Sequence, residues 1–123
     1  MKPFFFFLAL IFLFGSCASE EVVLDAGDPN VIVIGEMLFV TPEITAPSGA
    51  TIVILNNDDT PHSVTSQSAE DAFDNDGTFD VLVSSDGNGL LTLPEAPSGT
   101  VFYFYCKFHT SLMSPSTGTI TIE

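Results

Sequence analysis

The feature that most constrains the fold is an alternating aromatic segment, residues 100–106, that leads directly into a turn bearing histidine. Successive side chains of a β-strand point to opposite faces. One face carries Phe102, Phe104 and Cys106, and the other carries Val101, Tyr103 and Tyr105. We expect the phenylalanine face, with Cys106, to point to the core. The tyrosine face suits a half-solvated position, because each hydroxyl needs a hydrogen-bond partner.

The rest of the chain consists of short β-type runs, separated by clusters of Gly, Pro, Asn, Asp and Ser. The expected strands are residues 31–34, 37–40, 51–56, 62–66, 79–83, 90–93, 100–106 and 117–122. Threonine and isoleucine alternate in the last of them, which gives one polar and one apolar face. No segment after the N-terminal leader has helical periodicity. Seven or eight short strands predict an all-β fold, a Greek-key β-sandwich.

Residues 1–16 are interpreted as a lipoprotein signal peptide. Lys2 precedes an unbroken apolar run over residues 4–14, and a membrane-spanning helix would need a longer run, of about 20 residues. The run ends in Phe-Gly-Ser-Cys, which resembles the lipobox of bacterial lipoproteins with phenylalanine in place of the usual leucine. The resemblance implies that Cys17 is acylated and becomes the new N-terminus. Ordinary cleavage near Ala18 is the alternative.

An acidic tether and one folded domain are expected to follow the leader. Residues 17–30 are small, acidic and turn-prone, which is typical of a flexible linker, and the domain then covers residues 31–123. If Cys17 is acylated or removed, Cys106 has no partner within the chain. A lone thiol in an exported protein is a liability unless it binds a metal or reacts. A Cys17–Cys106 disulfide is the alternative, disfavoured because Cys17 lies at the edge of the leader.

Charge narrows the range of partners. Sixteen acidic residues face two basic ones, for a formal net charge of −14. A field of this sign excludes nucleic acid and opposes direct binding to an anionic membrane surface. It favours either a basic protein partner or simple solubility.

Residues 70–80 form an acidic stretch whose spacing does not fit an EF-hand, so a solvated loop is expected. Lys107, the only cation after the leader, could contact a partner or be solvated, and the second is expected.

Four side chains could bind one soft metal ion. Cys106, His109 and Met113 fall within eight residues, and His62 follows a proline far upstream. Two imidazoles, a thiolate and a weak thioether make up the ligand set of an electron-transfer copper site. Taken singly, His62 could be a surface histidine, and Cys106 could be a small buried hydrophobe. Met37, the other methionine after the leader, is expected in the core.

The order of these motifs carries a family resemblance. A histidine after an Asn/Asp turn, followed by Cys-x-x-His after an aromatic strand, is specific when both halves are read together. The similar segments are residues 49–58, 61–64, 73–77, 103–109 and 118–122. With them, residues 31–123 resemble the cupredoxins, in particular the plastocyanin and amicyanin branch. Independent roles for the two histidines and the thiol would not explain why all three fall at family positions.

The resemblance implies a two-sheet sandwich, one type 1 (blue) copper ion, and one-electron transfer between larger redox proteins. It implies His62, Cys106 and His109 as equatorial ligands and Met113 as the axial ligand. Met113 follows His109 by four positions, whereas the gap is three in the amicyanin-like branch and five in plastocyanin. In a three-residue register Leu112 would face the copper, and the lost axial sulfur would raise the reduction potential.

We prefer Met113, because its spacing lies within the family's range. Phe108, Pro61 and Leu112 are expected to surround the ligands. The family also implies an apolar patch around the exposed ring of His109, where the electron leaves.

The chain is therefore predicted to be an exported one-electron carrier of the bacterial cell envelope, with no enzymatic activity. It would be a monomer on the periplasmic side, lipid-anchored through Cys17. The residues after this cysteine lack aspartate, which slightly favours the outer membrane. Its partners would be transient redox proteins, such as a basic cytochrome steered by the acidic loop.

Two other functions remain open from the sequence. Copper sequestration or delivery without electron transfer is the main alternative, although the chain lacks the Met- or His-rich runs expected of a storage protein. A metal-free interaction module on the same sandwich is the other. An enzyme such as a multicopper oxidase or nitrite reductase is disfavoured, because it would need more histidines than the two present.

Overall fold

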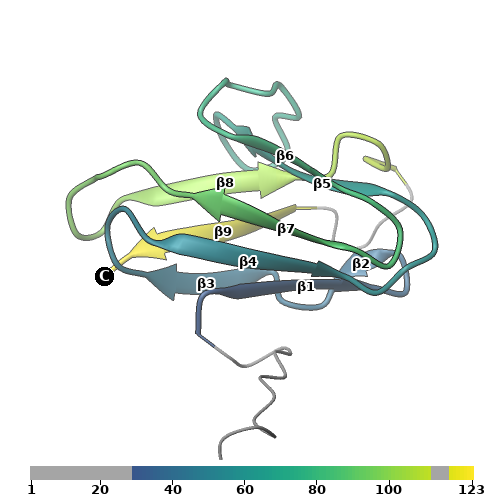
Figure 1. The fold of residues 1–123 in the computed structure, drawn as a ribbon. Helices are drawn as coiled ribbons and strands as arrows, with labels where there is room; N and C mark the ends of the chain where they lie inside the picture. Colours follow the sequence, from purple (N-terminus) through teal and green to yellow (C-terminus); the bar gives the residue numbers. More distant parts are fainter. Residues whose placement is uncertain (1–28, 112–116) are drawn as a thin grey trace, which may run out of the picture.

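Nine β-strands make up the described part of the chain, residues 29–111 and 117–123 of a computed structural model (Figure 1). In chain order they are β1 (Val31–Gly35), β2 (Leu38–Phe39), β3 (Glu43–Ala46), β4 (Thr51–Asn56), β5 (His62–Gln67), β6 (Asp80–Val83), β7 (Asn88–Thr92), β8 (Val101–Tyr105) and β9 (Thr117–Ile122). Among these residues no helix has the length and apolar character needed to cross a membrane. The expected all-β sandwich is confirmed.

The strands form two mixed sheets, which lie one over the other (Figure 1). One sheet has the order β2-β1-β4-β7, and the other has the order β3-β9-β8-β5-β6. β1 pairs parallel with β4, and β3 pairs parallel with β9, whereas the remaining pairs are antiparallel. Chain neighbours such as β4 and β5 lie in different sheets. These crossings bring β5 beside β8, although the two strands are far apart in sequence.

The sequence pattern does not predict the ninth strand, β3. Pro42 and Pro47 flank it, and only Ala46 of its four residues is buried, so its hydrophobic alternation is weak. It lies at the edge of its sheet and pairs with β9. Prolines are tolerated at such edges, because one side of an edge strand needs no partner. Long-range pairing defines this strand, and a local pattern cannot show it.

Alternating isoleucines build the core between the sheets. In β4 and β9 every second residue is buried, as the alternation predicts. The buried cluster draws on both sheets and includes Ile32, Ile34, Phe39, Ile52, Ile54, Val64, Leu91, Phe104, Ile120 and Ile122. The rings of Phe39 and Phe104 pack edge to face, with centroids 5.0 Å apart. This ring contact joins β2 of one sheet to β8 of the other.

The two faces of β8 differ from expectation at one residue. Phe104 and Cys106 are fully buried, so the prediction that this face points to the core is confirmed. The prediction of a half-solvated tyrosine face is wrong for Tyr105, which is only 4% exposed. Its ring packs against Phe73, with centroids 5.5 Å apart. The connection between β5 and β6 therefore covers the outer face of the sheet at this point.

Residues 70–78 of the acidic stretch are exposed, as expected of a solvated loop, and hydrogen bonds also tie this loop to the fold. Asp74 accepts the backbone N–H of Ser68 at 2.9 Å, and Asp76 accepts the hydroxyl of Ser66 at 2.5 Å. These serine bonds hold the pKa of both carboxyl groups below the ordinary aspartate value. Because Ser66 belongs to β5, Asp76 fastens the loop to that strand.

Candidate metal centre

Three of the four predicted ligands meet at one point. His62 is the first residue of β5, Cys106 directly follows β8, and His109 lies in the turn after it. β5 and β8 are antiparallel neighbours, with Thr65 opposite Tyr105. This register brings the start of β5 beside the turn that follows β8. One ligand atom from each of the three residues lies within 4.8 Å of the other two.

The distances between these donor atoms fit a single metal ion. Cys106 Sγ lies 3.7 Å from His62 Nδ1 and 3.6 Å from His109 Nδ1. Metal bonds of about 2.3 Å to sulfur and about 2.0 Å to nitrogen, at tetrahedral or trigonal angles, separate such donors by about 3.5–3.7 Å. The two imidazole rings have centroids 4.9 Å apart. The three side chains are therefore spaced to hold one ion.

Polar groups surround the sulfur of Cys106, which is buried and not part of a disulfide. Sγ accepts the backbone N–H of Ser63 at 3.4 Å, and the Cys106 carbonyl accepts the N–H of His109 at 3.3 Å. The thiolate is the form of cysteine that binds metals. Two imidazole nitrogens and an N–H donor around one sulfur suit a metal ligand, whereas a small buried hydrophobe would need none of them.

The carboxylate of Asp58 orients the His62 ring. His62 is fully buried, and its Nε2 lies 2.8 Å from Asp58 Oδ2. An ionised carboxylate only accepts hydrogen bonds, so Nε2 of the neutral ring carries the proton and Nδ1 keeps its lone pair. Burial alone would raise the pKa of Asp58. Hydrogen bonds from the backbone of Met37, from His62 and from the backbone of Glu36 outweigh burial and lower this pKa.

Met37 does not lie in the core, contrary to expectation. It is half-buried and shares the turn between β1 and β2 with Glu36. The N–H groups of both residues donate to Asp58, at 3.0 Å from Met37 and 2.7 Å from Glu36. The only sequence signal for Asp58 is its position four residues before His62, in an Asn-Asn-Asp-Asp turn. That signal is too weak to select one carboxylate out of sixteen acidic residues.

Lys107 forms an ion pair that the sequence does not predict, while its side chain stays 31% exposed. Its Nζ lies 2.7 Å from Asp80 Oδ2. Its backbone N–H donates to Ser63 Oγ at 3.0 Å, the hydroxyls of Ser63 and Thr65 are 2.8 Å apart, and Thr65 donates to Asp80 at 2.9 Å. Burial raises the pKa of Asp80, but the bonds from Lys107 and Thr65 outweigh it and the pKa falls. This ring of bonds ties the residue after Cys106 to β5 and β6.

His109 is the most exposed of the three donors. Burial and the nearby His62 ring lower its pKa, and the negative charge of Asp58 opposes them in part. A lowered pKa keeps the imidazole neutral at neutral pH, so its Nδ1 lone pair is available to a metal. Phe108 is 50% exposed, and its ring centroid lies 6.3 Å from that of His109. An apolar ring therefore borders the exposed edge of the site.

Met113, Leu112 and Cys17 lie outside the described residues. The axial ligand and the lipidation site therefore stay predictions.

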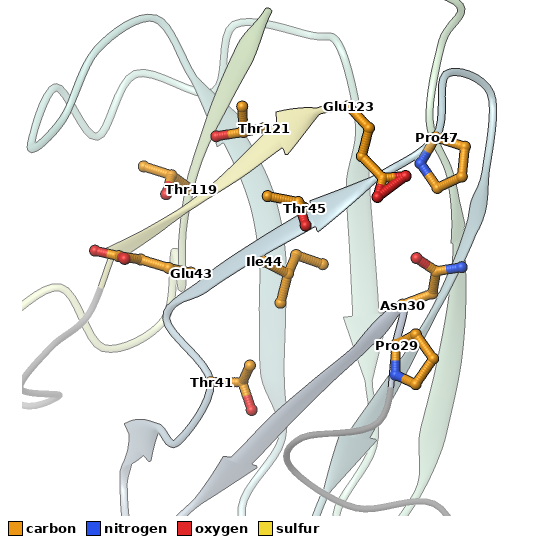
Figure 2. A pocket seen from close by; sticks show the side chains of 10 residues that line it. All are labelled: Pro29, Asn30, Thr41, Glu43, Ile44, Thr45, Pro47, Thr119, Thr121 and Glu123. Carbon is orange, nitrogen blue, oxygen red and sulfur yellow. The ribbon is translucent and has the colours of Figure 1, made fainter. Parts of the chain in front are cut away.

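An open groove of about 640 Å³ lies away from the three metal ligands, between the start of β1 and the outer face of β3 and β9 (Figure 2). Its lining includes Thr45 and Thr119 and none of the three donors.

Comparison with known proteins adds a family and a set of folds. Residues 28–123 match the family of copper binding proteins described as plastocyanin/azurin. No curated protein matches the chain. Among solved structures, amicyanin from Paracoccus versutus is 21% identical with a TM-score of 0.55, covering 80% of this chain and 85% of its own.

Two further structures have the same fold. A purple cupredoxin from Nitrosopumilus maritimus is 20% identical with a TM-score of 0.58, covering 80% of this chain and 100% of its own. A mutant fern plastocyanin is 19% identical with a TM-score of 0.54, covering 76% of this chain and 99% of its own. At such identities the likeness concerns the fold. The family match spans the sandwich and all three donors, and the chain therefore belongs to the plastocyanin/azurin family of copper-binding proteins, the cupredoxins.

Proposed function

We propose that this protein is a type 1 (blue) copper protein that carries one electron at a time between redox partners. The observation that carries the proposal is the buried sulfur of Cys106, at 3.7 Å and 3.6 Å from two imidazole nitrogens. His62, Cys106 and His109 would be the equatorial ligands. Met113 would supply the axial thioether, with Leu112 as the alternative neighbour. Bound copper would supply a one-electron couple between Cu(II) and Cu(I).

The surroundings of the donors suit such a couple. A thiolate favours the reduced ion, whereas imidazoles also suit the oxidised one, so a mixed set needs little rearrangement. Two strands and a ring of hydrogen bonds hold His62 and Cys106, and both are fully buried. His109 reaches the surface beside the exposed ring of Phe108. The electron would enter and leave at this exposed edge, while the buried donors stay fixed.

We further propose that the protein works in the bacterial cell envelope, on the periplasmic side. The support is the signal-like leader and the cysteine that ends it, which would be acylated to give a lipid tether at Cys17. A tether raises the effective concentration of membrane-bound partners. The net charge of −14 favours a basic partner, such as a basic cytochrome, in a transient complex with a monomer. The absence of aspartate after Cys17 slightly favours the outer membrane.

Visible spectroscopy tests the copper assignment. Residues 18–123 are expressed, loaded with Cu(II) and compared with the Cys106→Ser variant. We expect an intense charge-transfer band in the wild type and its loss in the variant, because the band requires the thiolate. Reversible voltammetry is then expected.

Other results would support other functions. Weak absorption or irreversible voltammetry would support copper sequestration or delivery instead. Absence of copper uptake would leave only a metal-free interaction module.

A further inference from the structure

The Asp58 carboxylate lies between a donor histidine and a turn with an unusual backbone. Oδ2 lies 2.8 Å from His62 Nε2 and 3.0 Å from the N–H of Met37, and Oδ1 lies 2.7 Å from the N–H of Glu36. The three hydrogen-bond donors come from two separate segments of the chain. Asp58 therefore links the turn between β1 and β2 to the cluster of metal ligands, although it is not itself one of the ligands.

The side chain of Asn56 holds the backbone of Asp58 in place. The Asn56 side chain is buried and donates to the carbonyls of Thr60, Val83 and Ser84, at 2.9, 3.3 and 3.0 Å. Its Oδ1 accepts the N–H of Asp58 at 3.0 Å. These bonds attach the segment between β4 and β5 to the end of β6. They therefore hold in place the backbone from which the Asp58 side chain extends.

The turn between β1 and β2 has a backbone that its residues do not favour. Gly35 pairs with Leu38, so Glu36 and Met37 are the two central residues of a two-residue hairpin turn. Their φ angles are 53° and 59°. Such turns need positive φ at both central positions and favour Asn-Gly, because other side chains are strained there. Strain of this kind persists where the surroundings hold it. Here both N–H groups are bound to one carboxylate.

We propose that the Glu36–Met37 turn, acting through Asp58, positions the His62 imidazole for copper. The turn fixes the carboxylate, the carboxylate fixes the Nε2 proton and the ring plane, and Nδ1 is left facing the Cys106 sulfur. Asp58 is thus a positioning residue that does not touch the metal. The inference rests on the copper site proposed above. Loss of such a partner behind a ligand typically costs about 10- to 100-fold in metal affinity.

The first experiment replaces the carboxylate. Asp58→Asn is compared with Asp59→Asn, an exposed neighbour that loses the same charge without contact to His62. Zn²⁺ is the probe, measured by competition with a chelator. We expect affinity to fall about 10- to 100-fold for Asp58→Asn and to stay near wild type for Asp59→Asn. The copper reduction potential is expected to rise in Asp58→Asn, because a charge that stabilises the oxidised ion is lost.

A second readout needs no metal. In the metal-free protein, ¹⁵N NMR of the His62 ring is expected to show the proton on Nε2. In Asp58→Ala no acceptor faces Nε2, and the proton is expected to move in part from Nε2 to Nδ1. A role limited to supporting the fold would not change the tautomer. If Asp58→Asn does not fold, Asp58→Glu keeps the charge but shifts its position, and Zn²⁺ affinity is expected to fall while the proton stays on Nε2.

The second experiment changes the turn. Insertion of two glycines between Glu36 and Met37 withdraws their N–H groups and leaves the Asp58–His62 pair chemically intact. We expect Zn²⁺ affinity to fall in the same direction as in Asp58→Asn. The matched control, Glu36→Asn with Met37→Gly, keeps both N–H groups in a turn that favours them. It is expected to bind Zn²⁺ as the wild type does and to unfold at a higher temperature.

Failure of this inference differs from failure of the proposed function. If Asp58→Asn and the insertion match Asp59→Asn in affinity and potential, and Asp58→Ala keeps the wild-type tautomer, while the wild type shows the intense visible band, the inference is overturned and the copper site stands. An insertion that matches the wild type while Asp58→Asn loses affinity overturns the role of the turn. If the wild type takes up no copper, the proposed function fails, and the NMR tautomer still decides whether Asp58 orients His62.

Discussion

At the scale of single residues, Gly118 shows how tightly the core beside the site is fitted. It lies in β9 opposite Phe104 of β8. A Cβ at this position would overlap the Phe104 ring and would lie 2.5 Å from the carbonyl oxygen of Pro42. Only glycine lets this ring pack against β9. Because Phe104 lies two residues before Cys106, the fit also supports the strand that carries the sulfur.

Gly118→Ala is therefore expected to destabilise the metal-free protein by about 1–3 kcal/mol, as is usual when a methyl group is forced into a packed core. Chemical denaturation measures the change in the free energy of unfolding. The control is Gly118→Ala combined with Phe104→Leu, in which a smaller side chain makes room. The double variant should lose less than the sum of the two single losses. An unchanged free energy of unfolding in Gly118→Ala alone would contradict this account.

The sequence predicts the metal ligands well, but it does not predict the residues that hold them in place. His62, Cys106 and His109 stand out by residue type and spacing, and the structure brings all three together. Asp58 does not stand out, because its partners Glu36 and Met37 lie 22 and 21 residues away. A backbone N–H has no signature in the sequence. Residue type can indicate what binds a metal, but only the folded chain shows what holds the ligand.

At the scale of elements, the connection between β5 and β6 acts as a cover for the outer face of β5. All six residues of β5 are buried, although a strand in a two-sheet sandwich needs only one buried face. Ser66 and Gln67 hold this cover through bonds to Asp76 and to the N–H of Phe73. The alternation rule assumes a solvated outer face, which is why it fails for Tyr105. Weak alternation likewise hides β3, which only its pairing with β9 defines.

This cover should make stability depend on pH. The Ser66 hydroxyl and the N–H of Thr78 lower the pKa of Asp76 below its ordinary value of 3.8, despite the opposing effect of burial. A lowered folded-state pKa means that the carboxylate stabilises the fold at neutral pH, and that this contribution is lost as the pH falls below 3.8 through the folded-state pKa. Asp76→Asn should lower the free energy of unfolding at pH 7 and flatten its acid slope. Denaturation from pH 7 to about pH 2 tests this.

Glu70→Gln is the matched control, because it removes an exposed carboxylate from the same connection. It should leave the acid slope close to that of the wild type. An equal flattening in both variants would mean that the slope reflects total charge and not the bonds of Asp76.

At the scale of the whole molecule, negative charge dominates. With sixteen acidic residues and two basic ones, the field favours encounters with basic proteins and opposes encounters with acidic ones. The bonds of Asp74, Asp76 and Asp80 keep these carboxyl groups ionised, because their pKa values are lowered. The composition alone predicts this field. It does not predict which carboxylates are fixed in place, since that depends on strands that meet only in the fold.

Electron transfer to a basic cytochrome should therefore slow as ionic strength rises, because salt screens charges separated by more than about 8–10 Å. Stopped-flow mixing of the reduced copper protein with an oxidised basic cytochrome measures the rate. A small uncharged oxidant is the control, and its rate should change little with salt. A cytochrome rate that does not depend on salt would argue against steering by the acidic surface.

The scarcity of positive charge has a practical consequence. After Lys2, Lys107 is the only residue of the sequence after which trypsin can cut. That peptide bond separates Cys106 from His109, and the lysine side chain is engaged by Asp80 at 2.7 Å. A single proteolytic nick would sever the loop between two donors, and its rate reports how often the loop opens. Digestion with trypsin thus measures directly whether the loop between Cys106 and His109 is closed.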